Sequence, residues 1–156
     1  MNRTRLITLT LLAAMLVLLG ACDLLNGVLG IPNPAKVLPD NTEIDDEYVL
    51  GDTGYDGWDL SADDLGIPAT ADKWYKITVP VHGSTISSTI WGSNPYTGDS
   101  RMAYAAVHAG AIDMDGGVFY IKTGGPDSGF YASTANDVTT TEYGDYSSSY
   151  VVYKAP

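Results

Sequence analysis

The 156-residue chain has a single cysteine, Cys22, and only two histidines, His82 and His108. One cysteine cannot form a disulfide within the chain, so a folded domain must be held by packing and hydrogen bonds alone. No Cys, Asp or Glu stands around either histidine at the spacing of zinc ligands, and we expect neither a metal nor a cofactor. The Gly-x-Ser-x-Gly, P-loop and His-Glu-x-x-His motifs are also absent, which argues against an enzyme.

Basic residues are scarce as well, with 8 Lys and Arg against 19 Asp and Glu and a formal net charge of -11. Cleavage after residue 21 would remove Arg3 and Arg5, leaving 6 basic residues against 19 acidic ones, or -13. Nucleic-acid binding requires clustered basic residues that neutralise phosphates, so we exclude nucleic acid as a partner. The acidity favours solubility and resistance to self-association.

Acidic residues are concentrated between positions 40 and 72, where 11 of the 19 lie without any Lys or Arg. The part from Asp52 to Asp63 has some features of a calcium loop, but Gly54 replaces a ligand and Asp63 replaces the bidentate Glu. A solvated acidic face is favoured, and the sequence leaves calcium binding open. Apolar residues within the segment, such as Trp58, predict that part of it packs on a core.

The N-terminus has the pattern of a secretory signal, with a basic start at residues 2–5 followed by an apolar run from Leu6 to Leu19. As a helix the run would rise about 21 Å, whereas a bilayer's hydrocarbon core is about 30 Å thick, so a cleaved signal peptide is favoured over a spanning helix. Residues 19–22, Leu-Gly-Ala-Cys, resemble the bacterial lipobox. The resemblance implies that Cys22 is alkylated with diacylglycerol and holds the protein on the lipid bilayer.

Lipidation predicts a cell-envelope protein, anchored to the inner or outer membrane. Asp23 resembles an inner-membrane retention signal. We expect four segments along the chain. They are the signal peptide at 1–21, a lipidated N-terminus and tether at 22–39, an acidic segment at 40–73 partly packed on the domain, and a folded domain at 74–156.

The folded domain is predicted to be α+β, with a short central helix at about 100–109 wrapped by antiparallel β-sheets. Apolar residues alternate in 75–81, and further strands are expected near 85–91, 118–123 and 149–154. Asp99 or Ser100 is predicted to cap the helix and Gly110 to end it. One stripe of the helix carries Met102 and three alanines, which predicts burial.

The same region resembles the LCCL domain family across roughly 80 residues. The residues that carry the resemblance are Trp91, Gly92, Tyr96, Ser100, Ala105, Ala106, His108, Gly110, Gly117 and Asn136. The resemblance implies a central helix wrapped by β-sheets and a binding or interaction module. Two positions depart from the family pattern, because Ala103 replaces a usual helix cysteine and Asp137 replaces the Gly of a common Asn-Gly pair.

These observations predict a non-enzymatic, membrane-anchored bacterial lipoprotein carrying an LCCL-like module, with an envelope protein or a surface glycan as its partner. His108 is interpreted as a buried histidine that hydrogen-bonds across the core. The alternative is an envelope hydrolase or glycan-processing enzyme that uses carboxylates of the acidic segment. It requires two carboxylates about 5–10 Å apart in a deep pocket. Several aromatic residues are candidates for stacking on sugars, although core positions are favoured: Trp91, Tyr96, Tyr131, Tyr143 and Tyr146.

Overall fold

The computed structural model describes residues 29–51, 57–81 and 89–156. The predicted signal peptide, Cys22, Asp23, His82 and most of the extended stretch predicted near 85–91 lie outside these residues. Within the described ranges, no helix has the length and apolar character needed to cross a bilayer.

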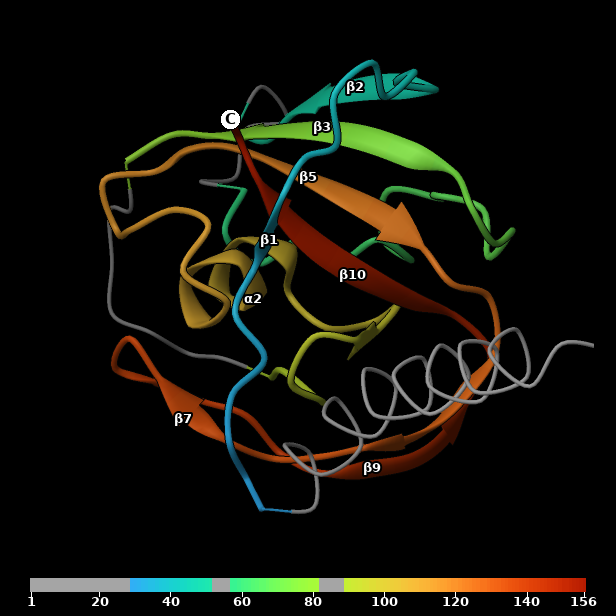
Figure 1. Cartoon of the computed structure of the whole chain (residues 1–156), viewed down its shortest axis with the longest axis vertical. Coiled ribbons are helices and arrows are strands. Elements are labelled where there is room, and N and C mark those ends of the chain that lie inside the picture. Colours follow the sequence, from blue (N-terminus) through green and yellow to red (C-terminus); the bar gives the residue numbers. More distant parts are fainter. Residues whose placement is uncertain (1–28, 52–56, 82–88) are drawn as a thin grey trace, which may run out of the picture.

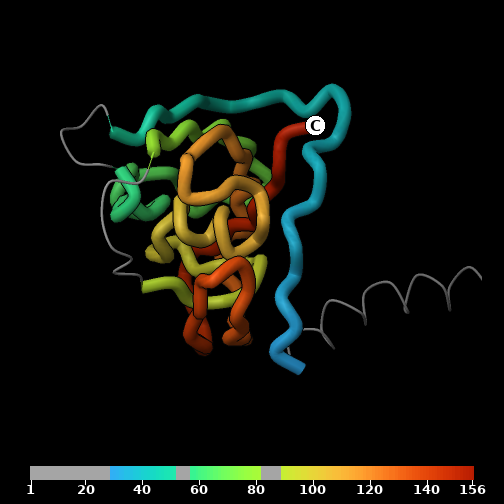
Figure 2. The backbone as a smooth tube through the Cα atoms, turned by 90° about the vertical axis from the view of Figure 1, so that its left-hand side faces the viewer, coloured from blue at the N-terminus to red at the C-terminus, as the bar shows by residue number. Residues whose placement is uncertain are grey.

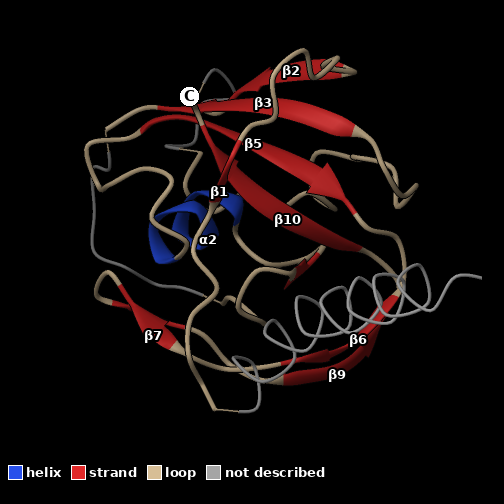
Figure 3. Ribbon diagram, viewed as in Figure 1, coloured by secondary structure: helices blue, strands red, loops and turns tan. Residues whose placement is uncertain are grey.

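A six-stranded sheet and one short helix form the body of the molecule (Figure 1, Figure 3). The strands of this sheet are β1 (Lys36–Val37), β2 (Asp46–Val49), β3 (Trp74–Val79), β4 (Tyr96–Thr97), β5 (Gly117–Thr123) and β10 (Ser149–Lys154). Their order is β1-β10-β5-β3-β2, and β4 also pairs with β10. Two small sheets pair β6 (Asp127–Phe130) with β9 (Tyr143–Tyr146), and β7 (Thr134–Ala135) with β8 (Val138–Thr139).

The sheet is mixed, so the prediction of antiparallel sheets is wrong at both edges. β3, β5, β10 and β4 pair in antiparallel fashion, but β1 is parallel to β10 and β2 is parallel to β3. Both parallel strands come from the segment before residue 50. A parallel pair needs a long connection, and the chain between β2 and β3 supplies one.

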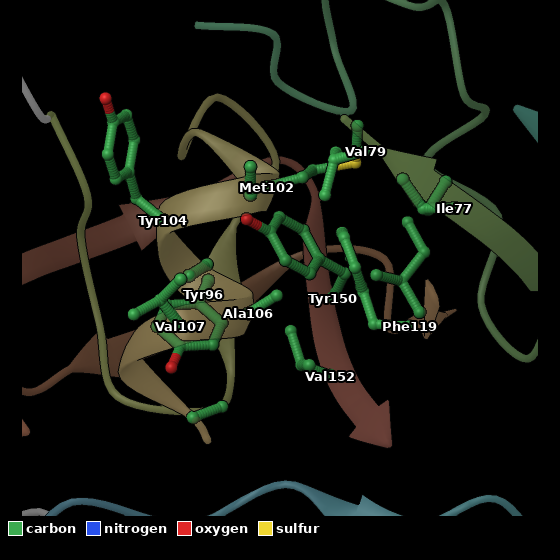
Figure 4. Close-up of a cluster of buried hydrophobic side chains, with 14 of the residues drawn as sticks. Ile77, Val79, Tyr96, Met102, Tyr104, Ala106, Val107, Phe119, Tyr150 and Val152 are labelled. Carbon is green, nitrogen blue, oxygen red and sulfur yellow. The ribbon is translucent and has the colours of Figure 1, made fainter. Parts of the chain in front are cut away.

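The core lies between this sheet and the helix α2 (Met102–His108). Alternate residues of β3, β5 and β10 are buried, as the predicted strand period requires. Figure 4 shows Phe119, Tyr150 and Val152 of the sheet beside the helix residues Met102 and Ala106. Every residue of α2 is buried, so the predicted apolar stripe understates how completely the helix is enclosed.

Both ends of the helix can be compared with the prediction. The predicted start is wrong, because Arg101 occupies the N-cap position without a side-chain cap, and the Ser100 hydroxyl binds Trp91 and Thr97 instead. The predicted end is confirmed. Gly110 has a φ of 72° and donates to Val107 O at 2.9 Å, and Ala111 donates to Ala106 O at 2.8 Å, which is the Schellman pattern.

Part of the acidic segment belongs to the core. Trp58 is fully buried, its indole N–H donates to Pro80 O at 2.9 Å, and its ring packs edge-on against Tyr104 with centroids 5.3 Å apart. Ala103, the position of the family's usual helix cysteine, is also fully buried. Hydrophobic packing around the helix therefore stabilises this chain at a site where the family usually has a cysteine.

The segment from residue 31 to residue 38, which we name the strap, runs along the outside of the body (Figure 2). It falls within the predicted tether. Ala35 donates from its backbone N–H to Ala109 O at 2.7 Å, and Leu38 donates to Lys154 O at 3.0 Å on either side of the β1–β10 pairing. These contacts fix the strap to both the helix end and the sheet edge.

Asn94 joins the strap to the sheet. β4 and β1 pair with opposite ends of β10, leaving Val152 between them without a backbone partner on that edge. The Asn94 side-chain oxygen accepts the Val152 N–H at 2.7 Å, and its amide nitrogen donates to Val152 O at 3.3 Å and Pro34 O at 3.4 Å. The side-chain amide thus takes the place of a strand residue in the ladder.

Candidate binding site

The family-motif residues converge on a buried polar network around His108, which is 1% exposed. The imidazole Nδ1 lies 2.8 Å from the Tyr96 hydroxyl, and Nε2 lies 3.1 Å from the Ser133 hydroxyl. Ser133 in turn donates to Ser93 Oγ at 2.7 Å. This direction assigns the imidazole proton to Nε2, so that Nδ1 accepts from Tyr96.

Burial keeps this network uncharged. It lowers the pKa of His108, an effect that a hydrogen bond to the backbone of Ser133 partly opposes, and it raises the pKa of Tyr96. Both side chains are therefore neutral at pH 7. Because His108 is buried and both of its ring nitrogens are hydrogen-bonded within the module, its chemistry is that of a structural hydrogen-bond network rather than of a general base.

Asn136 performs a second structural task at the end of the helix. Its side-chain amide donates to His108 O at 3.1 Å and to Val107 O at 3.0 Å, and Val107 O also accepts from Gly110 N–H. Asn136 and Asp137 have φ values of 48° and 61°, as a type I′ turn between β7 and β8 requires. The Asp that replaces the family's Gly is therefore accommodated in the left-handed region.

The remaining motif residues shape turns and packing. Gly92 has a φ of 95°, and a Cβ there would lie 2.4 Å from Pro95 O. Gly117 opens β5 with a φ of 138°. Trp91 donates its backbone N–H to Ser100 Oγ at 2.9 Å, and Ala105 and Ala106 are fully buried in α2. The motif therefore defines the frame of the module and not an exposed reactive centre.

Carboxylates of the acidic segment gather at one recess, of about 410 Å³, which Asp63 and Asp64 line together with Asp99 and Arg101. Asp63 accepts bonds from Tyr146 and Ser148, both at 3.0 Å. Hydrogen bonds from Ser61 lower the pKa of Asp64. A glycosidase needs one carboxyl with a raised pKa to act as the acid. The lowered pKa of Asp64 does not suit that role, which argues against Asp64 as the acid of the predicted hydrolase alternative.

A different recess, which we name the strap cleft, has a volume of about 530 Å³, within the range of small-molecule sites. The strap forms one wall, the loop at Ser93–Pro95 a second, and the end of β6 a third. Val151 and Tyr153 of β10 belong to the sheet face opposite the core. The lining residues are Asn33, Pro34, Ala35, Lys36, Ser93, Asn94, Pro95, Ser128, Gly129, Phe130, Tyr131, Val151 and Tyr153.

The predicted sugar-stacking aromatics do not form one site. Tyr131 lines the strap cleft, while Tyr96 is fully buried beside His108. Trp91, Tyr143 and Tyr146 contact one another elsewhere, with successive ring centroids 6.0 and 5.8 Å apart. Only one of the five aromatic residues therefore contributes to the cleft.

Sequence reasoning missed the strap cleft, because its strap wall was assigned to a tether. One signal in the sequence marks both sides of it. Asn-Pro occurs at 33–34 and again at 94–95, and both pairs line the cleft. Asn33 donates from its side chain to Asn94 O at 3.3 Å, so the two dipeptides bind each other. Asn-Pro is typical of turns, but the sequence alone does not show that these two turns meet.

A strand-rich module built around one enclosed helix, with its histidine used internally and an open cleft at its surface, has the features of a binding domain. The chain belongs to the LCCL domain family, whose profile matches residues 58–150. LCCL domains are non-catalytic binding modules. The chain is 32% identical over 80 residues to clotting factor C of Tachypleus tridentatus and to Limulus clotting factor C of Carcinoscorpius rotundicauda. Each match covers 51% of this chain but only 7% of the relative's length.

The limits of the family match divide the strap cleft. The match begins at Trp58, so it includes the end of the acidic segment as well as the predicted domain. It ends at Tyr150, which leaves the strap and the outer part of β10 outside. Part of the cleft is therefore formed by residues that lie outside the matched module.

Proposed function

We propose that this protein is a non-enzymatic lipoprotein of the bacterial cell envelope, held on a membrane by lipid on Cys22, whose LCCL module binds an envelope component in the strap cleft. The observation that carries the binding role is the cleft itself. It combines aromatic side chains with hydroxyl and amide groups, whereas the motif residues are used inside the module. This is the composition of a recognition site and not of a reaction centre.

The strap supports the anchored arrangement. Six residues separate Leu29 from Cys22, and the seven Cα–Cα steps between them reach about 25 Å when fully extended. Leu29 and Ile31 are 65% and 45% exposed, so apolar side chains continue toward the anchor at the start of the strap. The module would stand close to the membrane, with the strap cleft beside the point where the chain leaves it.

The anchor is tested on the full chain by intact mass and membrane fractionation, with a Cys22→Ser variant as the matched control. We expect the wild-type protein to gain the mass of acyl chains and to remain with membranes after a high-salt wash. The serine variant should lack that mass and be released. If both proteins are unmodified and soluble, the lipid anchor is disproved.

Binding is tested separately with the soluble Cys22→Ser protein and washed cell envelopes. We expect the protein to sediment with the envelopes, and we expect Tyr153→Ala to reduce the sedimented fraction. Tyr48→Ala is the control, because Tyr48 lies in β2, at the edge of the sheet opposite β1 and the strap cleft. Equal loss from both variants, or no sedimentation at all, would contradict a binding role for the cleft.

A further inference from the structure

Two tyrosine rings line the strap cleft, and the ring of Tyr153 is held in place by packing. The Tyr153 ring packs on Trp74 with centroids 4.8 Å apart, and the Lys122 ammonium lies 5.6 Å from the Trp74 ring on the same face of the sheet. Gly129 has a φ of 77°, and a Cβ there would lie 3.7 Å from Tyr131 Cζ. The glycine therefore leaves one side of the Tyr131 ring uncovered. Rings fixed before binding lose little entropy when a ligand stacks on them.

The polar groups of the cleft fall into two sets. Ser93 and Asn94 are used to hold the strap and β10 together, as described above. By contrast, the hydroxyls of Ser128, Tyr131 and Tyr153 make no hydrogen bond to any part of the chain that the structure describes. Each of these hydroxyls can both donate and accept. The cleft thus offers aromatic faces beside hydroxyl groups that remain available to a ligand.

The charge of the molecule limits what can enter. Among the residues that the structure describes, Lys36 is the only charged side chain that lines the cleft, and the chain as a whole carries a formal net charge of -11. A surface of this sign repels polyanions at low ionic strength. A proline-rich peptide would need side-chain amides to read its backbone carbonyls, but the Asn94 amide is already bonded to Val152 and Pro34.

We propose that the strap cleft binds a short, uncharged glycan segment, with sugar rings against Tyr131 and Tyr153 and sugar hydroxyls bonded to the free hydroxyls of the cleft. This proposal rests on the binding role proposed above and names its ligand class. Sugars combine a C–H face, which stacks on aromatic rings, with hydroxyls that donate and accept, and both features match the cleft. Because the strap and Tyr153 lie outside the family match, this preference belongs to this chain.

The test uses the soluble Cys22→Ser chain on an array of neutral and acidic oligosaccharides, followed by calorimetry with the best binder. We expect neutral glycans to bind, with an affinity that changes little between low and physiological salt. Tyr131→Ala and Tyr153→Ala should each weaken binding about tenfold, as loss of a central aromatic contact does. Tyr48→Ala, in β2 at the opposite edge of the sheet, should bind as the parent does, and Tyr131→Phe, which keeps the ring, should lose less than Tyr131→Ala.

Three outcomes would overturn the proposal. These are binding of acidic glycans alone, binding of a proline decamer in place of glycans, and the absence of any glycan binding. Circular dichroism of each variant separates a lost contact from a lost fold. The anchor is measured on the full chain and does not enter this test. Envelope sedimentation without glycan binding would leave the proposed function standing and remove only the ligand class.

Discussion

At the scale of single residues, the histidine of the module acts as a connector. Tyr96 precedes α2, His108 ends it, and Ser133 follows β6, yet all three meet at one imidazole ring. The imidazole ring gives the buried hydroxyls of Tyr96 and Ser133 their hydrogen-bond partner, so one network satisfies these polar groups. A buried polar network of this kind specifies a single arrangement of the elements that it joins, and its value depends on every member staying paired.

The stability of the protein should depend on pH through His108. The unfolded chain takes up a proton at this residue near its ordinary pKa of 6.5, whereas burial lowers the pKa of the folded ring. The unfolded state therefore binds more protons just below pH 6.5, and the free energy of unfolding falls as the pH is lowered through that window. The slope can reach about 1.4 kcal/mol per pH unit. Urea denaturation at several pH values between 5 and 8 measures it.

The control for this experiment is His108→Gln, which keeps a polar group but cannot take up the proton. His82 is present in both proteins, so only the titration of His108 differs between them. We expect the variant to be less stable at pH 7.5 and to lose part of the slope between pH 5.5 and 6.5. Identical slopes in the two proteins would show that the folded ring takes up its proton as easily as the unfolded one.

Asn136→Ala should destabilise the protein by about 1–3 kcal/mol, because His108 O would lose the Asn136 amide and Val107 O would keep only its bond from Gly110. Asp137→Ala is the matched control. Asp137 lies in the same turn with a similar positive φ, and its side chain shows no hydrogen bond to the described residues. Thermal or urea unfolding of both variants would isolate the contribution of the amide. Equal losses would assign the effect to backbone strain alone.

At the scale of elements, the glycine that precedes β5 is a point of close approach. Gly116 has a φ of 84°, and a Cβ there would lie 2.5 Å from the backbone oxygens of Val79 and Pro80. Backbone strain alone should cost Gly116→Ala roughly 1–3 kcal/mol, and the contact adds to this cost. Gly144→Ala is the control, because nothing lies within 4 Å of a Cβ at that position. We expect the free energy of unfolding of Gly144→Ala to stay within about 0.5 kcal/mol of that of the parent protein.

The central strands were predictable because their side chains alternate between two faces, as in Tyr75, Ile77 and Val79 of β3. The edge strands β1 and β2 could not be predicted in this way. They have two and four residues, most of them exposed, so their side chains show no alternation of buried and exposed positions. The helix end followed from Gly110. The helix start did not, because tertiary contacts with Trp91 and Thr97 engage the Ser100 hydroxyl that a local cap would have used.

At the scale of the whole molecule, the excess of acidic residues should oppose folding through self-repulsion. The formal net charge of the chain is -11, and its described ion pairs, such as Lys76 with Glu47 at 3.0 Å, are solvent-exposed. Exposed pairs contribute little to stability, so added salt should screen more repulsion than attraction. We expect the Tm of the Cys22→Ser protein to rise as NaCl is increased. A falling Tm would show that the ion pairs dominate.

The candidate site shows how far a linear sequence determines a surface. The family motif could be found from residue order, and most of its members are buried, although Gly110 and Asn136 are exposed. The strap cleft could not, because Asn33, Asn94, Tyr131 and Tyr153 are separated by long stretches of chain and meet only after β1 and β10 have paired. The two Asn-Pro pairs indicate turns, while the contact between them is a property of the folded chain.

The two parallel edge strands also determine how the chain could be shortened. A version that begins at residue 58, where the family match starts, would lose β1 and β2 together and leave backbone groups of β10 and β3 without partners. Bare strand edges of this kind pair with other copies of the same chain. The strands β1 and β2 therefore protect the sheet from edge-to-edge aggregation. In size-exclusion chromatography, the module trimmed to residue 58 should elute as oligomers, whereas the longer protein should elute as a monomer.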